Sequence, residues 1–126
     1  MAGSGDPQEG FAAGFTPAGP QKVKRTGLRL SEAAAADIVE QADRYKEQSG
    51  PPLAKRWEKA VTSALLRVLE NPRAGTICTF RRAELSGVRR VPVAGFRKHL
   101  IFYQFRGAEI LVLRVLHGAR DLESLR

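Results

Sequence analysis

The chain of 126 residues has a single cysteine, Cys78, and contains no long apolar run. One thiol cannot form an internal disulfide, so the composition favours a reducing compartment, and we expect the cytoplasm. No apolar segment approaches the ~20 residues that a membrane-spanning helix needs. The N-terminus lacks a basic segment followed by an apolar one, so we expect no signal peptide.

The sequence also lacks the residue spacings of metal, nucleotide and nucleophile sites. Its histidines, His99 and His117, and its one cysteine are not spaced like zinc ligands. No serine lies in an elbow motif, and no base stands near Cys78 in the sequence. The segments AGFRK and SGVRR are turns with basic flanks rather than phosphate-binding loops. We therefore expect no metal and no cofactor.

Most of the chain has the composition of one small folded domain, with 43% hydrophobic and 27% charged residues. Residues 1–25 differ, because the first twenty hold five of the twelve glycines and three of the seven prolines. So little apolar surface cannot offset the entropy lost on ordering. We predict a disordered or poorly packed tail over residues 1–25 and a domain over residues 26–126.

The positive charge is concentrated in the second half. The formal charge is +8, and residues 73–126 hold eleven bases and four acids, whereas residues 26–72 hold seven of each. A basic half is typical of proteins that meet nucleic acid, an acidic protein segment or a membrane surface. The same charge could serve only to keep the protein soluble and monomeric, and composition leaves both alternatives open.

Two helices are predicted in the first half of the domain. Ser31 is a good N-cap, because its hydroxyl can accept a hydrogen bond from a first-turn amide. Helices over residues 32–48 and 53–70, separated by the Gly-Pro-Pro segment, should form an antiparallel hairpin. Their apolar stripes, at helical spacing, are Ala35, Ile38, Ala42 and Tyr45, and Trp57, Val61, Ala64, Leu65 and Val68.

The remainder of the domain is predicted to be a sheet. Residues 28–30 form a short strand candidate, and strands with antiparallel pairing are expected at residues 76–80, 88–93, 99–105 and 109–115. Pro92 argues for an edge or a bulge, because it donates no hydrogen bond. The predicted fold is α+β: an N-terminal strand, an antiparallel helix hairpin and a meander of three or four antiparallel strands, with the helices on one face.

The last two predicted strands are apolar at nearly every position. Residues 99, 101, 103 and 105 lie on one face of their strand, whereas Leu100 and Phe102 lie on the other. An antiparallel strand with one face in water should alternate between apolar and polar residues. The helix hairpin covers only one face, so we expect the other to stay partly open and another polypeptide to cover it.

The basic residues of the second half form the main candidate site. They could contact phosphates, with Tyr103 or His99 nearby for stacking or proton transfer. A solvated side chain is the simpler interpretation for any single arginine, whereas the one-sided placement of the set favours a function. His117 is either a proton donor or a turn-closing group, and we favour the structural role. The set is Arg81, Arg82, Arg89, Arg90, Arg97, Lys98, Arg106, Arg114 and Arg120.

Four segments together resemble a known family. They are LRLSEAAAADI at residues 28–38, NPRAG at 71–75, GVRRVPV followed by HLIFYQF within residues 87–105, and RVLHGARDLESL at 114–125. Their order and spacing are similar to those of the ParE toxins of the RelE/ParE superfamily, which belong to bacterial type II toxin–antitoxin pairs. The last segment is the most specific. The first 25 residues have no counterpart.

The resemblance implies a cytoplasmic growth-inhibiting toxin that a cognate, ParD-like antitoxin wraps and holds inactive. It implies DNA gyrase as the target, binding of operator DNA only through the antitoxin, and no membrane partner. We expect a binding toxin with no catalytic residues of its own. Contacts with the target or the antitoxin are predicted at Arg89, Arg90, Arg97, Leu100, Phe102, Tyr103, Arg114, His117 and Arg120.

The RelE branch of the superfamily suggests an alternative, because its members cleave mRNA on the ribosome. Leu100 stands where that branch has a catalytic arginine, and no tyrosine follows Asp121. These missing proton-transfer groups favour the ParE branch. A ribosome-dependent mRNA endonuclease is the second hypothesis, and a non-toxic member that serves only in the antitoxin complex is the third. The nuclease would use Arg120, His117, His99, Tyr103 and Arg97.

Overall fold

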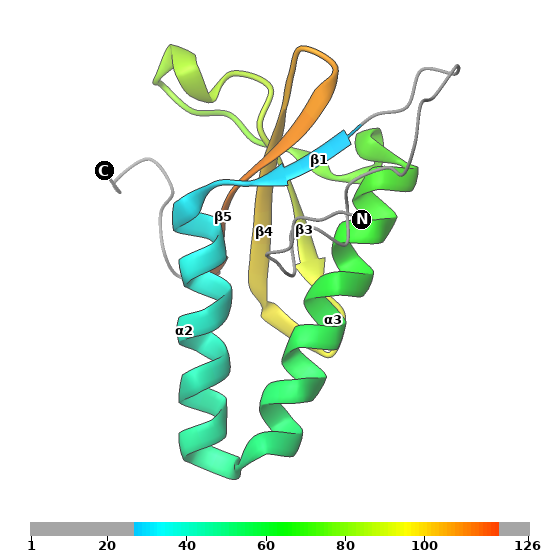
Figure 1. Cartoon of the computed structure of the whole chain (residues 1–126). Coiled ribbons are helices and arrows are strands. Elements are labelled where there is room, and N and C mark those ends of the chain that lie inside the picture. The colour runs from blue at the N-terminus through cyan, green and yellow to red at the C-terminus, as the bar shows by residue number, and fades with distance from the viewer. Residues whose placement is uncertain (1–26, 119–126) are drawn as a thin grey trace.

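The computed structural model describes residues 27–118, which form a five-stranded sheet with two helices on one face (Figure 1). This arrangement confirms the predicted α+β fold. The strand order is β1-β5-β4-β3-β2. The elements are β1 (Gly27–Leu30), α2 (Glu32–Ser49), α3 (Pro51–Glu70), β2 (Thr76–Ile77), β3 (Arg89–Val93), β4 (Phe96–Arg106) and β5 (Glu109–His117), with short helical turns at η1 (Pro72–Ala74) and η2 (Ala83–Leu85).

The helix hairpin forms as the sequence indicates. The Ser31 hydroxyl caps α2 by accepting a hydrogen bond from the Ala34 amide (2.9 Å), and it donates one to the Leu113 carbonyl (2.8 Å) on β5. Gly50 joins the helices with a φ of 86°, which favours glycine. α3 begins at Pro51, earlier than expected, because the first helical turn does not need the N–H that proline lacks. Neither helix of the described range combines the length and apolar character needed to cross a bilayer.

The sheet adds one pairing that the prediction left open and differs from the prediction in one place. β1 runs parallel to β5, with Leu28 opposite Ile110, so the N-terminal strand makes the sheet mixed. A parallel pair needs a long crossover, which the intervening helices and strands provide. The strand expected at residues 76–80 ends at Ile77, and residues 78–88 form a loop closed by a hydrogen bond from the Cys78 amide to the Val88 carbonyl (2.8 Å).

Pro92 lies at an irregularity of the sheet, as expected. The register between β3 and β4 shifts between Pro92 and Val93. β2 pairs only with Arg89 and Arg90, so no ladder hydrogen bond is required from Pro92 on that side. The prediction of an edge or bulge at this residue is confirmed.

The main core lies between the helix hairpin and the sheet. The predicted stripe of α3 is entirely buried there, and Trp57 and Leu65 join Ile101 and Tyr103 of β4 in one cluster. On α2 the structure buries Ala34 in place of the expected Ala35. The Trp57 Nε1 donates a hydrogen bond to the Ile38 carbonyl (3.0 Å), so the largest buried side chain also ties the two helices together.

A second, smaller core lies on the opposite face of the sheet. Phe102 of β4 and Leu116 of β5 pack there with Val88, and the surrounding half-buried residues are Cys78, Phe80, Leu85, Leu100 and Leu113. The expectation of an open apolar face is therefore wrong at Phe102, which is only 5% exposed. The physical reason is that the loop over residues 78–88 contributes its own apolar side chains and folds over this face.

One polar side chain fixes that loop to the sheet. Gln104 is buried on β4, and its Nε2 donates hydrogen bonds to the carbonyls of Glu84 (2.9 Å) and Ser86 (2.8 Å). The buried amide is thus satisfied by loop backbone rather than by water. Gln104 therefore holds the loop over residues 78–88 against the sheet, on a face where the loop buries only a small apolar cluster.

Candidate functional site

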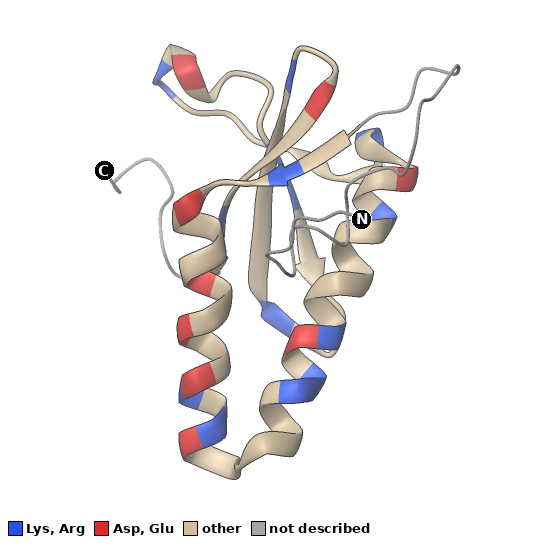
Figure 2. Ribbon diagram, viewed as in Figure 1, with Lys and Arg blue, Asp and Glu red and all other residues tan. Residues whose placement is uncertain are grey.

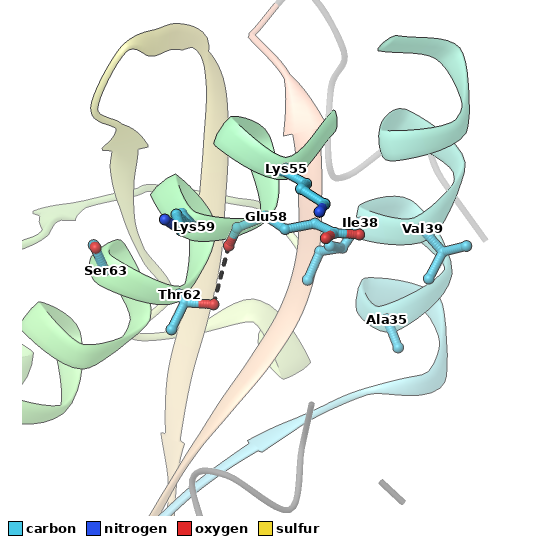
Figure 3. Close-up of a pocket in the computed structure, with 8 residues that line it drawn as sticks. All are labelled: Ala35, Ile38, Val39, Lys55, Glu58, Lys59, Thr62 and Ser63. Carbon is cyan, nitrogen blue, oxygen red and sulfur yellow. Dashed lines mark hydrogen bonds between the residues drawn. The ribbon is translucent and has the colours of Figure 1, made fainter. Parts of the chain in front are cut away.

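A groove of about 730 Å³ lies between α2 and α3 (Figure 3). Its α2 side is apolar, formed by Ala35, Ile38 and Val39, and Val39 is 57% exposed. Its α3 side is polar, and Lys55 and Glu58 extend from α3 toward Ile38. The groove can therefore hold an apolar surface while presenting charged groups along one edge. The α3 lining is Lys55, Glu58, Lys59, Thr62 and Ser63.

The two helices that flank this groove differ in charge (Figure 2). Acidic residues predominate on α2, whereas basic residues predominate on α3. The α3 cations on the groove, Lys55 and Lys59, form no ion pair with another described residue in the structure. The acidic set of α2 is Glu32, Asp37, Glu40, Asp43 and Glu47, and the basic set of α3 is Lys55, Arg56, Lys59 and Arg67.

Two of the predicted contact arginines are used inside the fold. Arg114 forms a bidentate ion pair with Asp37, with both N–O distances 2.8 Å, and Asp37 also accepts the Val115 amide (2.9 Å). The hydrogen bonds to Asp37 raise the pKa of Arg114. Arg89 donates from Nη1 to the carbonyls of Arg73 (3.1 Å) and Gly75 (2.8 Å). Arg114 fastens α2 to β5, and Arg89 fastens the η1 segment to β3, so both already have hydrogen-bond partners within the chain.

Tyr103 is also a structural residue. It is 1% exposed, and its hydroxyl donates to the Pro72 carbonyl (2.7 Å) and accepts from the Gly75 amide (3.1 Å). Burial is the main cause of its raised pKa. The prediction that Tyr103 contacts a partner or takes part in proton transfer is therefore wrong for this conformation, because no partner can reach a hydroxyl enclosed by the chain.

The histidines lie together at the far end of the sheet. His99 and His117 are directly opposite on β4 and β5, with ring centroids 5.5 Å apart and planes at 85°. His99 is buried, and its Nε2 lies 3.0 Å from the Tyr45 hydroxyl of α2. Burial, and to a smaller extent the charge of His117, lowers the pKa of His99. His117 is exposed at the end of β5.

The remaining predicted residues fall into different environments. Arg90 and Arg97 are exposed, whereas Leu100 is half-buried in the second core. Arg120 lies outside the described residues. The predicted nuclease set is thus not gathered in one place: Arg97, His99 and His117 share one pocket, and Tyr103 lies in the core. Within residues 27–118 no three His, Cys, Asp or Glu side chains are grouped to hold a metal ion.

Comparison with known proteins agrees with this fold. The sequence model described as "ParE toxin of type II toxin-antitoxin system, parDE" matches residues 28–122. The chain belongs to the ParE toxin family. A solved structure described as "Chromosomal ParDE TA system from P. aeruginosa" has the same fold as this ParE-family chain, with a TM-score of 0.63 and 20% identity. The likeness covers 75% of this chain and 98% of that one. No curated protein matches the sequence.

Sequence reasoning missed the groove of this ParE-family chain and the partner of Arg114. Val39 was a usable signal, since it is a large apolar residue off the core stripe of α2. Asp37 gave no signal, because its partner is 77 positions away in the sequence. The sequence correctly indicated Tyr45 as part of the apolar stripe of α2. It gave no sign of the hydrogen bond between Tyr45 and His99, because that bond depends on how α2 crosses β4.

Proposed function

We propose that this chain is the active toxin of its pair, that it stops growth by binding DNA gyrase in the cytoplasm, and that a cognate antitoxin holds it inactive. Membership of the ParE toxin family supports the first part. The exposed cations Arg90, on the loop-covered face beside Cys78, and Arg97, on the helix-covered face beside His99, each give their surface an affinity for acidic protein or for the DNA that gyrase carries. Operator DNA is bound through the antitoxin.

The observation that favours gyrase over mRNA cleavage is the burial of Tyr103. A ribonuclease of this superfamily needs general acid and base groups that reach the RNA. Here Tyr103, the tyrosine of the predicted nuclease set, is enclosed, with its hydroxyl committed to Pro72 and Gly75. Arg89 and Arg114 are committed to carbonyls and to Asp37. The nuclease hypothesis therefore lacks an accessible tyrosine hydroxyl, although Arg97, His99 and His117 of its predicted set share one pocket.

The groove between α2 and α3 is the seat that we propose for the antitoxin. An amphipathic helix fits it, since such a helix places apolar residues at intervals along one face. Its apolar face would cover Ala35 and Val39, and acidic residues on its edge would pair with Lys55 and Lys59. This seat replaces the far face of the sheet, where the chain's own loop already covers Phe102.

A paired assay tests the target. The full chain is induced in bacteria without antitoxin, and purified protein is added to a gyrase supercoiling assay and to a translation reaction programmed with mRNA. We expect a DNA-damage response, inhibited supercoiling and intact mRNA. Rapid cleavage of mRNA at ribosome-positioned codons, with supercoiling unaffected, would establish the nuclease hypothesis instead. Induction without any growth defect would support the non-toxic alternative.

A matched pair of variants tests the antitoxin seat. Val39 and Ile77 are both large apolar residues of nearly equal exposure, 57% and 55%, but only Val39 lines the groove. With the antitoxin taken as the short acidic reading frame beside the toxin gene, Val39→Asp should reduce co-purification at least tenfold, because a buried carboxylate would face apolar residues. Ile77→Asp should leave the complex intact. Equal retention of both variants would contradict the proposed seat.

A further inference from the structure

A pocket of about 300 Å³ opens at the end of the sheet, away from the groove between the helices. Its lining combines both histidines of the chain with two cations and two aromatic rings. A volume of this size is at the lower end for sites that hold small ligands. The lining residues are Tyr45, Gly95, Phe96, Arg97, Lys98, His99 and His117.

The sheet register brings the two imidazoles as close as a strand pair allows. His99 and His117 face one another across β4 and β5. The Gly118 amide donates to the carbonyl of Lys98, the residue before His99, so the two histidines are a non-hydrogen-bonded pair. Side chains approach most closely in pairs of this type. The two rings therefore form one wall of the pocket rather than two separate surface groups.

The contact between Tyr45 and His99 leaves a hydrogen-bond donor beside the pocket in every neutral arrangement. A neutral imidazole carries one N–H and a tyrosine one O–H, and the bond between Nε2 and the hydroxyl uses one of them. If the hydroxyl donates, the imidazole keeps its N–H at Nδ1, and if Nε2 donates, the hydroxyl keeps its proton. Among the described residues, the side chains of His99 and Tyr45 form no other hydrogen bond.

The charge around these donors is positive. Arg97 and Lys98 line the pocket and are exposed, and neither forms an ion pair within residues 27–118. The residues that line it include no carboxylate. This combination repels metal cations and attracts anions. Arginine, lysine and histidine together are the donors that bind phosphate oxygens through charge-assisted hydrogen bonds.

We propose that this pocket binds a phosphate group, held by Arg97, Lys98 and His117 with the Tyr45–His99 pair as a further donor. The rings of Phe96 and Tyr45 lie 5.3 Å apart and give a nucleotide base an apolar surface. The phosphate group is therefore supplied either by inorganic phosphate or by a mononucleotide. The site is separate from the antitoxin seat and does not rest on the identity of the toxin's target.

The histidine signals of the full chain report directly on this site. Because the chain has only two histidines, the imidazole NMR spectrum of untagged protein contains no signal from elsewhere. Inorganic phosphate, AMP and adenosine are titrated separately at constant ionic strength. We expect saturable shifts of both imidazoles with phosphate and with AMP and none with adenosine. Bound phosphate should also raise the measured pKa of His99, since an adjacent anion favours its protonated form.

Substitutions separate a built site from general attraction to a basic protein. His117→Gln and Arg97→Gln should each weaken phosphate binding roughly tenfold, as expected for loss of a charge-assisted hydrogen bond. Lys55→Gln, which removes an exposed cation of α3 outside this pocket, is the matched control and should bind as the parent does. The His99 signal remains to report binding in the His117 variant.

The affinities of the pocket for AMP and for inorganic phosphate distinguish the two possible sources of the phosphate group. AMP binding at least tenfold tighter than inorganic phosphate identifies a nucleotide site, and equal affinities identify a free-phosphate site. Three results would overturn the proposal: shifts that grow without saturation, adenosine binding as well as AMP, or equal weakening by Lys55→Gln and Arg97→Gln.

Discussion

The two faces of the sheet are covered in different ways. On one face a helix hairpin buries Trp57, Ile101 and many neighbours, and its two helices are joined by the Trp57–Ile38 hydrogen bond. On the other face the loop over residues 78–88 forms a cluster whose buried members in the described range are Val88, Phe102 and Leu116. The hydrogen bonds of one side chain, Gln104, hold that loop.

This difference indicates where stability resides. Hydrophobic stabilisation scales with the apolar area removed from water, so the helix face should supply most of the free energy of folding. The loop face should open first, because few buried contacts and exposed backbone are typical of segments with low local stability. The cover over residues 78–88 can therefore open locally while the helix face stays folded.

The largest expected effect is on the helix face. Trp57→Ala should lower the free energy of unfolding by about 3–5 kcal/mol, because it leaves a cavity and removes the bond to Ile38. Leu66, on the same helix, is 46% exposed, and Leu66→Ala should change stability by no more than ~0.5 kcal/mol. Urea unfolding followed by circular dichroism measures both. Similar losses of unfolding free energy for the two variants would mean that the buried face of the helix hairpin is not the main source of stability.

A second effect is expected where η1 joins the sheet. A Cβ at Gly75 would lie 2.3 Å from the Tyr103 hydroxyl oxygen, so Gly75→Ala must displace Tyr103 and should cost about 1–3 kcal/mol. Tyr103→Phe removes that oxygen, although two ring carbons of Tyr103 remain 3.0 Å from the new Cβ. The double variant should therefore lose less stability than the sum of the single losses. Strict additivity of the measured free energies would refute this account of Gly75.

Neighbouring residues of β4 compare the two faces directly. Ile101 and Phe102 are both buried, but Ile101 belongs to the main core and Phe102 to the loop-covered cluster. Ile101→Ala should cost ~2–5 kcal/mol, whereas Phe102→Ala should cost less than the ~3–5 kcal/mol usual for phenylalanine, because the loop can collapse into the space. Phe102→Ala should also speed trypsin cleavage within residues 78–88. A larger loss for Phe102→Ala than for Trp57→Ala would reverse the comparison.

The helix face could be predicted from the sequence, and the loop face could not. The helix pair, the Ser31 cap and the Gly50 turn each depend on residues close in sequence and were predicted correctly, although Ala34 is buried in place of Ala35 and α3 begins at Pro51. The loop cover depends on Gln104 reaching the carbonyls of Glu84 and Ser86, which no local pattern encodes. The same limit applies to the site: His99 and His117 were singled out by residue type, but their pairing depends on the register of β4 and β5.

The smallest expected effect is a loss of stability in weak acid, centred on His99. Burial, and then the neighbouring His117, hold the pKa of His99 below its usual value, so the folded state keeps this imidazole neutral. The unfolded chain takes up a proton near its ordinary pKa of ~6.5, whereas the folded chain does not, so the free energy of unfolding should fall as the pH drops below ~6.5. The fall should end at the lower folded-state pKa. Groups facing the ring are Tyr45, Trp57 and His117.

Urea unfolding in phosphate-free buffer between about pH 7.5 and pH 5.5 measures this effect, since most carboxylates stay ionised throughout that range. His117→Gln should make the fall shallower, because it removes the second charge and lets His99 protonate more easily in the folded state. His99→Gln should abolish most of the fall in the free energy of unfolding between these pH values. A free energy of unfolding that stays flat in the parent protein, or rises on acidification, would show that His99 is hydrated and that this end of the helix-covered face is as open as the loop-covered one.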